Sequence, residues 1–367
     1  MNTQIQDKFT FKNGQTMRNR VVLAPMTICA SDPGGYVSQA DIDFFARRSR
    51  SVGMVITGST YVHPLGKSFA ESFSGAEDDK IEGLSRLAKA IKDQGALAIV
   101  QLYHGGRMVL PDLIDGQPVA PSAVKAPRDY LAEPRALKNS EVEQVIEDFL
   151  SAIRRAIQAG FDGVELHGAN TYLIQQFVSP HSNVRQDKWG GSLNNRLRFP
   201  KTLLKRAKQL VKEEADRPFL IGYRFSPEEL EEPGIQLYDT LQLLEQLIYH
   251  QVDYLHISTS DVWRSSIRDS QDSEPVIEKI IRKINDRVPL IGVGQIETKQ
   301  DAQRVLDAGI PLFALGKALL LDPDWTEKVV SGREAEVIRA YRDELLADLA
   351  LPTAFVEDAR SYLEGKD

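Results

Sequence analysis

The sequence predicts an α/β fold, a single (β/α)8 TIM barrel with long loops after strands 3 and 4. Three observations predict it: a repeated helix–glycine–apolar run, about eight such apolar runs, and two long irregular connections that follow strands. Short runs that are apolar throughout are typical of parallel strands buried on both faces. One barrel can account for all 367 residues, so we expect a single ligand-binding domain over 1–367.

The expected strands can be assigned in order along the chain. Four of them follow a glycine at a helix end, at Gly53, Gly95, Gly160 and Gly309. An open, doubly wound sheet is the structural alternative, but it needs fewer strands and usually a G-x-G-x-x-G turn after the first strand. The expected strands are 21–24, 54–57, 96–102, 161–167, 219–224, 252–258, 289–293 and 310–315.

The connections carry further information. Ser140 and Glu143 resemble a capping box that opens a helix reaching Ile157. The segments 104–139 and 168–195 are the long loops after the third and fourth strands, on the side where barrels place their active sites. Segment 334–367 is expected to be a C-terminal helical extension, interrupted at Pro352.

Composition excludes several classes of protein. With 45 basic and 52 acidic residues, the net charge of −7 argues against a nucleic-acid partner. The single Cys29 excludes an internal disulfide, an iron–sulfur cluster and a cysteine zinc site. The N-terminus lacks a signal sequence, and no apolar run is long enough for a bilayer, so we expect a cytoplasmic enzyme without membrane contact. A homo-oligomer is possible, and the oligomeric state stays open.

The strand ends indicate the ligand. They carry hydrogen-bonding side chains, one arginine, and glycines after the last two strands. Barrels often bind phosphate between the loops after strands seven and eight, so Gly294–Gln295 and Gly316–Lys317 could form a phosphate cradle. No metal-ligand motif, nucleophile elbow or P-loop is present, so no metal is expected. These observations predict a phosphorylated ligand with a planar polar head and a small-molecule substrate.

Two adjoining motifs resemble a known family. The run from His167 to Pro180, HGANTYLIQQFVSP, resembles the active-site strand and loop of the Old Yellow Enzyme family of FMN-dependent ene-reductases. The pattern from Asn183 to Phe199, with Arg185, Asp187 and Trp189, resembles that family's longest signature. Shorter matches extend the resemblance over about residues 9–325.

The resemblance implies an activity and a set of roles. The single domain would bind FMN and carry hydride from NADH or NADPH, through N5 of the flavin, to activated C=C bonds of α,β-unsaturated carbonyl or nitro compounds. His167 and Asn170 would bind the substrate oxygen, and Tyr172 would protonate the α-carbon. Cofactor-binding residues would be Pro25, Met26, Thr27, Ser59, Gln101, His167, Arg224, Gly294, Gln295, Gly316 and Lys317. The alternative is a flavin-binding redox protein without ene-reductase turnover.

Other residues are interpreted as structural. Arg196 and Trp189 are expected to brace and pack the long loop, and Glu165 and His256 to have structural roles in their strands. Cys29 is expected to be small and buried, and the acidic run 228–232 to be a solvated loop.

The chain departs from the family pattern at two positions. Lys317 stands where the family usually has arginine, and Thr171 stands where glycine is common. A lysine would offer the phosphate a point charge instead of two parallel donors, and the threonine would alter the loop that carries Tyr172.

Overall fold

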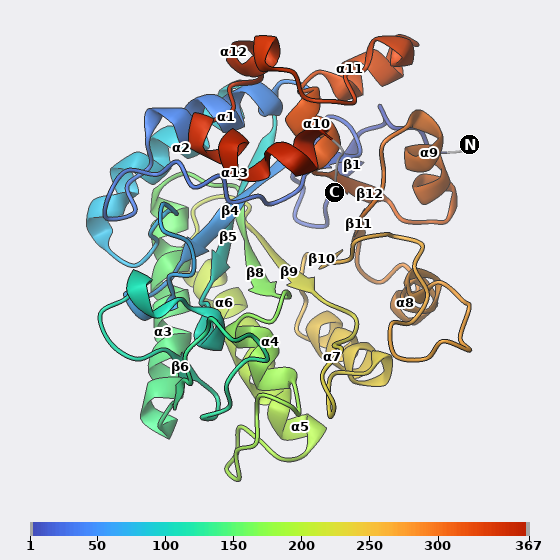
Figure 1. The fold of residues 1–367 in the computed structure, drawn as a ribbon. Coiled ribbons are helices and arrows are strands. Elements are labelled where there is room, and N and C mark those ends of the chain that lie inside the picture. The colour runs from blue at the N-terminus through green and yellow to red at the C-terminus, as the bar shows by residue number, and fades with distance from the viewer. Residues whose placement is uncertain (1–2, 365–367) are drawn as a thin grey trace.

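Eight parallel strands close into a barrel in the computed structural model, which describes residues 3–364 (Figure 1). Each strand pairs with the next barrel strand in sequence, and the last pairs with the first. This confirms the predicted (β/α)8 barrel and excludes the open sheet. The strands are β3 (Val21–Leu23), β4 (Met54–Tyr61), β5 (Leu97–Tyr103), β8 (Gly163–Gly168), β9 (Leu220–Phe225), β10 (Tyr254–Ile257), β11 (Leu290–Val293) and β12 (Leu312–Leu315).

Alternation along the strands creates two cores. In β3, Val21 and Leu23 pack outward against the helices, while Val22 joins a smaller cluster inside the barrel. Both clusters are buried, so a strand needs apolar residues at consecutive positions, which is the pattern seen in the sequence. The outer helices are α1 (Gln39–Ser49), α2 (Ile81–Asp93), α3 (Asn139–Gln158), α6 (Arg198–Glu214), α7 (Leu237–Tyr249), α8 (Val276–Ile284), α9 (Lys299–Asp307) and α10 (Lys317–Leu321).

Strand β4 is longer than predicted and carries a register shift between Ile56 and Ser59. Gly58 lies within this shift, and a Cβ there would meet the Met26 carbonyl oxygen at 2.6 Å. Only glycine fits such a close approach of two backbones. The irregularity lets Ser59 pair with Gln101 near the carboxyl ends of the strands.

Helix α3 begins earlier than expected. The carboxylate of Glu141 accepts a hydrogen bond of 2.7 Å from the backbone N–H of Lys138, the residue that caps the helix. The predicted capping box at Ser140 and Glu143 is therefore wrong, because both residues lie inside the first turns. Glu141 occupies the third helical position, where a glutamate can accept from the otherwise unpaired N–H of the capping residue.

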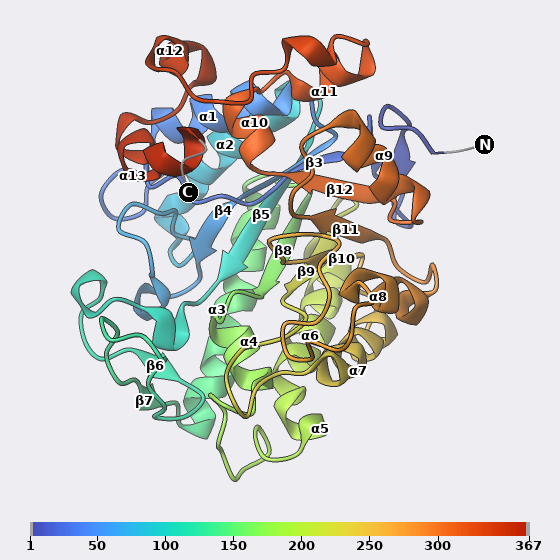
Figure 2. The same ribbon diagram turned by 45° about the vertical axis from the view of Figure 1, so that its right-hand side comes forward.

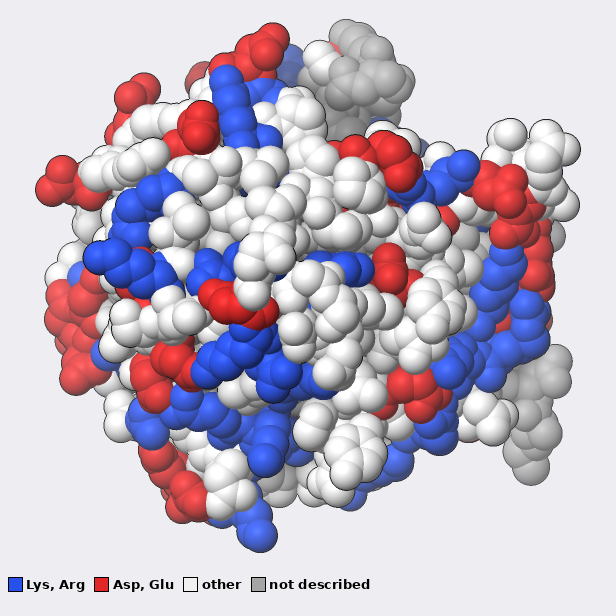
Figure 3. Space-filling view, turned by 90° about the horizontal axis from the view of Figure 1, so that it is seen from below, with Lys and Arg blue, Asp and Glu red and all other residues white. Residues whose placement is uncertain are grey.

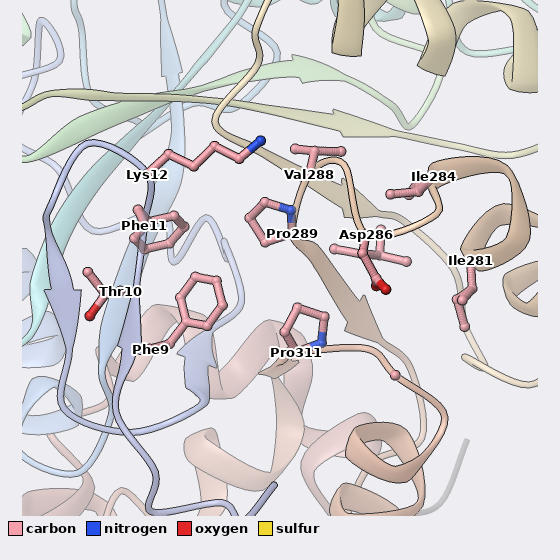
Figure 4. Close-up of a pocket in the computed structure, with 12 residues that line it drawn as sticks. Phe9, Thr10, Phe11, Lys12, Ile281, Ile284, Asp286, Val288, Pro289 and Pro311 are labelled. Atoms are coloured by element: carbon pink, nitrogen blue, oxygen red, sulfur yellow. The ribbon is translucent and has the colours of Figure 1, made fainter.

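A hairpin closes the amino end of the barrel. Its strands are β1 (Phe9–Thr10) and β2 (Thr16–Met17), and the buried Phe11 and Met17 belong to the inner core. Beside it lies a hollow of about 260 Å3, lined mainly by apolar side chains such as Phe9 and Pro289 (Figure 4). The hollow lies at the end of the barrel opposite the predicted active site.

The two long loops contain short elements. The loop after β5 holds two parallel strands, β6 (Val119–Ala120) and β7 (Arg135–Ala136), and the loop after β8 holds α4 (Leu173–Val178) and α5 (Leu193–Arg196). Arg196 donates to the carbonyl oxygens of Val178 and Gly191 at 2.8 and 2.7 Å, and Trp189 is buried. Both structural interpretations are confirmed.

The C-terminal extension is less helical than predicted. After α11 (Trp325–Val330), the segment 334–349 has two 3-10 turns and the four-residue α12 (Leu346–Leu349), and a longer helix, α13 (Thr353–Glu364), follows Pro352. The predicted ranges 1–367 and 334–367 also include residues 1, 2 and 365–367, which lie outside the described residues. Figures 1 and 2 show α12 and α13 beside α1 and α10.

A buried arginine fixes this extension to the barrel. Arg48 in α1 donates to the carbonyl oxygens of Phe44 and Leu349, at 3.0 and 2.9 Å. Burial, with a smaller contribution from Arg47, lowers the pKa of Arg48 to about 9. Because the Leu349 carbonyl oxygen accepts from this buried guanidinium, a charge-assisted hydrogen bond holds the extension against α1.

The surface carries both signs of charge. On the face seen in Figure 3, Lys and Arg side chains are interspersed with Asp and Glu. Within residues 3–364, no helix is both long enough and apolar enough to cross a bilayer.

Candidate active site

The carboxyl ends of neighbouring strands bring the predicted residues together. The Thr27 hydroxyl accepts a hydrogen bond of 3.1 Å from the backbone N–H of Ser59. The Ser59 hydroxyl in turn donates to the Gln101 side-chain oxygen at 3.2 Å. Three of the predicted cofactor residues, from the ends of β3, β4 and β5, therefore form one hydrogen-bonded row.

A buried carboxylate, Glu165, links two side chains beneath the site, and we call Glu165, Gln101 and His256 the floor of the site. Glu165 of β8 is fully buried, and its two oxygens accept from Gln101 Nε2 at 2.7 Å and His256 Nδ1 at 3.0 Å. Burial alone would raise the pKa of Glu165, but His256, Arg224 and Gln101 outweigh it and hold that pKa below its usual range. The group is therefore an anion that neutralises nearby positive charge.

Sequence reasoning misses this network. It gives Glu165 and His256 only structural roles, whereas the structure places both in contact with the site. A charged residue inside an apolar strand must find a partner, so Glu165 within the run 161–167 carries a signal. Its partner cannot be identified from the sequence, because His256 is 91 residues away and comes close only when the barrel closes.

The network fixes the Gln101 side chain and leaves two buried nitrogen atoms without a partner among the described residues. The Gln101 amide nitrogen donates to Glu165, and the Gln101 amide oxygen accepts from Ser59. These two hydrogen bonds fix the orientation of the amide. Arg224 of β9 has a buried Nε without a partner among the described residues, and His256 Nε2 is in the same state. Buried polar atoms left unpaired are costly, so this floor is built to receive a polar ligand.

His167 and Tyr172 lie in direct ring contact. Their rings meet edge to face, with centroids 4.9 Å apart and an interplanar angle of 82°. The His167 Nδ1 accepts from the backbone N–H of Ala169 at 3.3 Å. Burial, with Arg224 and His256, holds the pKa of His167 well below its usual value. The imidazole is therefore neutral, and its Nε2–H is the available donor.

Tyr172 caps helix α4 and keeps its proton. Burial raises the pKa of the phenol to about 12, although Arg224 and Arg128 act in the opposite direction. The ring of Tyr103 packs against it, with the ring centroids 5.2 Å apart. At neutral pH, Tyr172 is thus a protonated phenol held between two aromatic rings, with positive charge nearby.

A strained turn joins the two residues. Asn170 and Thr171 both have positive φ, at 56° and 63°. The Asn170 N–H donates to Ser226 Oγ at 3.0 Å, and the Thr171 N–H donates to Gln175 Oε1 at 3.0 Å. For threonine this conformation is rare, so the hydrogen bonds from neighbouring loops hold it in place. A glycine at this position would be unstrained.

The side chain of Asn170 faces the loop after β10. Its Oδ1 accepts a hydrogen bond of 2.8 Å from the Ser258 hydroxyl. That bond leaves the amide nitrogen as the free donor of Asn170. The structure thus brings His167 and Tyr172 together, whereas it anchors Asn170 to Ser258.

The acidic run 228–232 is solvated only in part, because Glu232 is exposed whereas the first two glutamates are buried. Glu228 and Glu229 are only 7% and 5% exposed. Glu229 accepts from Gln175 Nε2 at 2.7 Å and from the Ile235 N–H at 3.1 Å. The prediction is wrong for Glu228 and Glu229, because their partners lie outside the acidic run and the charge pattern does not indicate them.

The predicted phosphate cradle combines two backbone segments. Gly294 has φ of 113°, and a Cβ there would meet the backbone of Ser260 and Asp261 at 2.7 Å. Gln295 also has positive φ, at 49°. The backbone at Gly316 is more open, because a Cβ there would have only the Met26 sulfur nearby, at 3.7 Å.

Lys317 follows Gly316 at the start of α10. Its ammonium lies 4.7 Å from the ring centre of Tyr362 in α13. The C-terminal extension therefore contacts the lysine that stands beside the predicted cradle, through a cation–π interaction.

Cys29 differs from expectation. It is half-buried rather than buried, and its φ is positive, at 47°. Burial and the nearby charge of Glu71 raise the pKa of its thiol. The chain turns sharply here, just after Pro25, Met26 and Thr27, and the turn leaves Cys29 only partly covered. The raised pKa keeps the thiol protonated and unreactive.

Comparison with known proteins identifies the family. The family model described as "NADH:flavin oxidoreductase / NADH oxidase family" matches residues 7–336. The chain belongs to this family. It is 45% identical over 332 residues to the probable NADH-dependent flavin oxidoreductase YqiG of Bacillus subtilis (strain 168), covering 90% of this chain and 89% of that protein.

Two further relatives extend the comparison. The NADH:fumarate oxidoreductase of Klebsiella pneumoniae (strain 342) is 47% identical over 340 residues, which are 92% of this chain but 37% of that protein. The chain therefore spans little more than a third of that relative. The Old Yellow Enzyme homologue of Zymomonas mobilis superposes with a TM-score of 0.78 at 26% identity, covering 90% and 93% of the two chains. The resemblance to the Old Yellow Enzyme family is confirmed.

The flavin oxidoreductase family uses FMN as cofactor and NADH or NADPH as donor, and the site fits FMN. The unpaired Arg224 Nε and the oriented Gln101 amide suit the polar edge of a flavin. The open backbone at Gly316 suits a phosphate. These residues would hold the polar edge of the flavin and the phosphate of the cofactor.

Proposed function

We propose that this flavin oxidoreductase reduces C=C bonds conjugated to a carbonyl or nitro group, with a reduced nicotinamide as donor. One observation carries the proposal: a neutral histidine donor and a protonated tyrosine, His167 and Tyr172, lie in ring contact at the carboxyl end of the barrel. An alkene reduction needs both groups, one to bind the substrate oxygen and one to supply a proton.

In this proposal, His167 polarises the substrate. Its Nε2–H donates to the carbonyl or nitro oxygen, and the Asn170 amide nitrogen supplies a second donor. As negative charge develops on the oxygen, these bonds strengthen and make the β-carbon electron-poor. A neutral imidazole suits this task because its proton stays on the donor nitrogen. Bound FMN supplies the hydride chemistry.

Tyr172 holds the proton that balances the reaction. The α-carbon takes this proton from the phenol, while the β-carbon gains the hydride that came from the nicotinamide. With a pKa of about 12, the phenol carries its proton at neutral pH. Arg224 and Arg128 favour its anionic form, so they stabilise the phenolate until solvent reprotonates it.

The test is an anaerobic spectrum of the FMN-loaded protein. We expect the flavin absorbance to bleach with NADH and to return when 2-cyclohexenone is added, with cyclohexanone as product. Bleaching without return on any enone or nitroalkene would contradict the proposal. If NADH does not bleach the flavin absorbance, the assignment of NADH as the donor is contradicted.

A second function is favoured by one observation. Because the chain matches 37% of the Klebsiella NADH:fumarate oxidoreductase, a barrel of this kind also occurs as one part of a larger redox protein. The chain would then be a flavin redox unit without ene-reductase turnover. Return of the absorbance with ferricyanide, but with no activated alkene, would favour this second function. The single cysteine suits a reducing cytoplasm in either case.

A further inference from the structure

A cavity of about 360 Å3 adjoins the proposed substrate site. It lies between the loops that follow β5, β8, β9 and β10, and Asn170 forms part of its wall. The hydroxyls of Ser226 and Ser258, which hold the Asn170 turn, also line it. A ligand that reaches Asn170 can therefore extend into this cavity.

Arg264 lines the cavity without a partner. Its buried Nε has no hydrogen bond, and within residues 3–364 its guanidinium forms no ion pair. Four residues further on, Arg268 is fully engaged and donates to the carbonyl oxygens of Glu229 and Glu231 at 2.5 and 2.8 Å. The loop thus uses one arginine for its own structure and leaves the other free.

The backbone holds Arg264 in position. Its N–H donates to the Asp261 carbonyl oxygen at 3.3 Å, and its own carbonyl oxygen accepts from the Val276 N–H at 3.0 Å. A second contact of Asp261, from its side chain to the Trp263 N–H at 2.8 Å, braces the same turn. These hydrogen bonds fix the backbone at Arg264, so ligand binding has to order only its side chain.

Three glutamates line the same cavity, Glu228, Glu229 and Glu231, and the carboxylates of the first two are already satisfied. Glu228 accepts from Ser266 Oγ at 2.6 Å and from the Ile267 N–H at 3.0 Å. Glu229 is held by Gln175 and Ile235, as described above. Within residues 3–364, none of the three glutamates forms an ion pair with Arg264.

We propose that Arg264 binds an anionic oxygen group of a reaction partner, with Arg128 as a second cation at the rim of the cavity. A guanidinium matches both carboxylate and phosphate through two parallel N–H donors. The group is either the phosphate of the nicotinamide donor or a carboxylate on the alkene. This inference rests on the proposed function for the identity of these partners.

Equilibrium binding tests the subsite without turnover. The FMN-loaded protein is titrated calorimetrically with inorganic pyrophosphate and with succinate, a dicarboxylate that cannot be reduced at a C=C bond. We expect at least one anion to bind, and Arg264→Gln to weaken that binding at least about tenfold, with partial recovery in Arg264→Lys. Arg50→Gln removes the same charge from an exposed position just after α1 and should leave binding unchanged.

Separate measurements on the donor and on the alkene distinguish the two candidate anions, the donor phosphate and the alkene carboxylate. If the donor phosphate binds here, Arg264→Gln raises the Kd for NADH about tenfold but not that for 1-benzyl-1,4-dihydronicotinamide, which has no phosphate. If a carboxylate binds here, the variant raises the KM for acrylate relative to 2-cyclohexenone.

Two outcomes would overturn the inference: neither anion binds the native protein, or Arg264→Gln and Arg50→Gln bind them alike. Equal thermal unfolding and flavin spectra show that the variants are folded. Because the titrations need no alkene reduction, a failure of the ene-reductase proposal would leave their result intact.

Discussion

The two ends of the barrel differ in the side chains that they bury. At the amino end, the β1–β2 hairpin covers the strands with Phe11 and Met17, both buried, and Phe9 packs edge to face on Phe11 with ring centroids 4.9 Å apart. At the carboxyl end, the buried Glu165 and the half-buried Arg224 carry charge, and the buried Arg224 Nε is unpaired among the described residues. Apolar packing therefore covers the amino end, whereas charged groups lie at the carboxyl end, where barrels place their active sites.

The backbone shows the same contrast. Near the amino end, the left-handed positions after α8 are Asn285 and Asp286, residue types that tolerate positive φ. At the carboxyl end, the β-branched Thr171 is held in that conformation next to Tyr172. The difference indicates that strain is accepted beside Tyr172, the proposed proton donor.

The largest expected effect is a loss of stability without a loss of FMN binding. Phe11→Ala removes a buried ring from the hairpin and should lower the free energy of unfolding by about 3 kcal/mol. FMN binding should stay nearly unchanged, because the hairpin lies at the opposite end. Urea unfolding and a fluorescence titration with FMN measure the two effects. A large loss of FMN affinity with unchanged stability would contradict the proposal that the amino end serves stability and the carboxyl end binds the cofactor.

Acid should destabilise the carboxyl end. Burial lowers the pKa of His104 to about 3 and also lowers the pKa values of His167 and His256. The unfolded chain takes up protons at these histidines near pH 6.5, whereas the folded chain does not, so stability falls as the pH drops below about 6.5. Each histidine contributes up to about 1.4 kcal/mol per pH unit.

Urea unfolding between about pH 7 and pH 5 measures this loss. His104→Gln should make the pH dependence shallower. An unchanged slope in that variant would remove His104 from the account.

Glu165→Gln tests the floor of the site. Removing a buried negative charge beside Arg224 should favour reduced flavin, which carries more negative charge. We expect about a tenfold shift in the ratio of reduced to oxidised flavin at a fixed potential, which is about 30 mV. Spectroelectrochemistry measures it, with Glu141→Gln at the start of α3 as control. A shift to lower potential would contradict the assigned charge of Glu165.

Relieving strain should have the smallest effect. Thr171→Gly removes an unfavourable positive φ and should raise the free energy of unfolding by up to about 1 kcal/mol. Asn285→Gly near the amino end should change it by less than about 0.5 kcal/mol, because asparagine already tolerates this conformation. Equal effects in thermal unfolding would show that Thr171 stores no special strain.

Much of the fold follows from local patterns. The strands are predictable because their apolar runs are short and four follow a helix-ending glycine, and the barrel confirms all of them to within a few residues. The start of α3 is harder to predict, because Glu141 and Glu143 both suit a capping role. The segment 334–345 is expected to be helical, but it forms only 3-10 turns where it packs on the barrel.

The site is predictable only where residues are neighbours in sequence. His167, Asn170 and Tyr172 lie close together in the chain, and the motif that contains them is recognisable. The pairing of Glu165 with His256, and of Glu229 with Gln175, spans distant segments. Such pairs arise when the barrel closes, so no local pattern predicts them.

The central claim is that Tyr172 supplies the proton for alkene reduction. Its most direct test compares Tyr172→Phe with Tyr103→Phe, whose hydroxyl accepts from the Ser68 N–H at 2.9 Å. Rapid mixing measures flavin reduction by NADH and reoxidation by 2-cyclohexenone separately. The account predicts normal reduction in both variants and reoxidation slowed about a hundredfold or more in Tyr172→Phe alone. Unchanged reoxidation in Tyr172→Phe would contradict it.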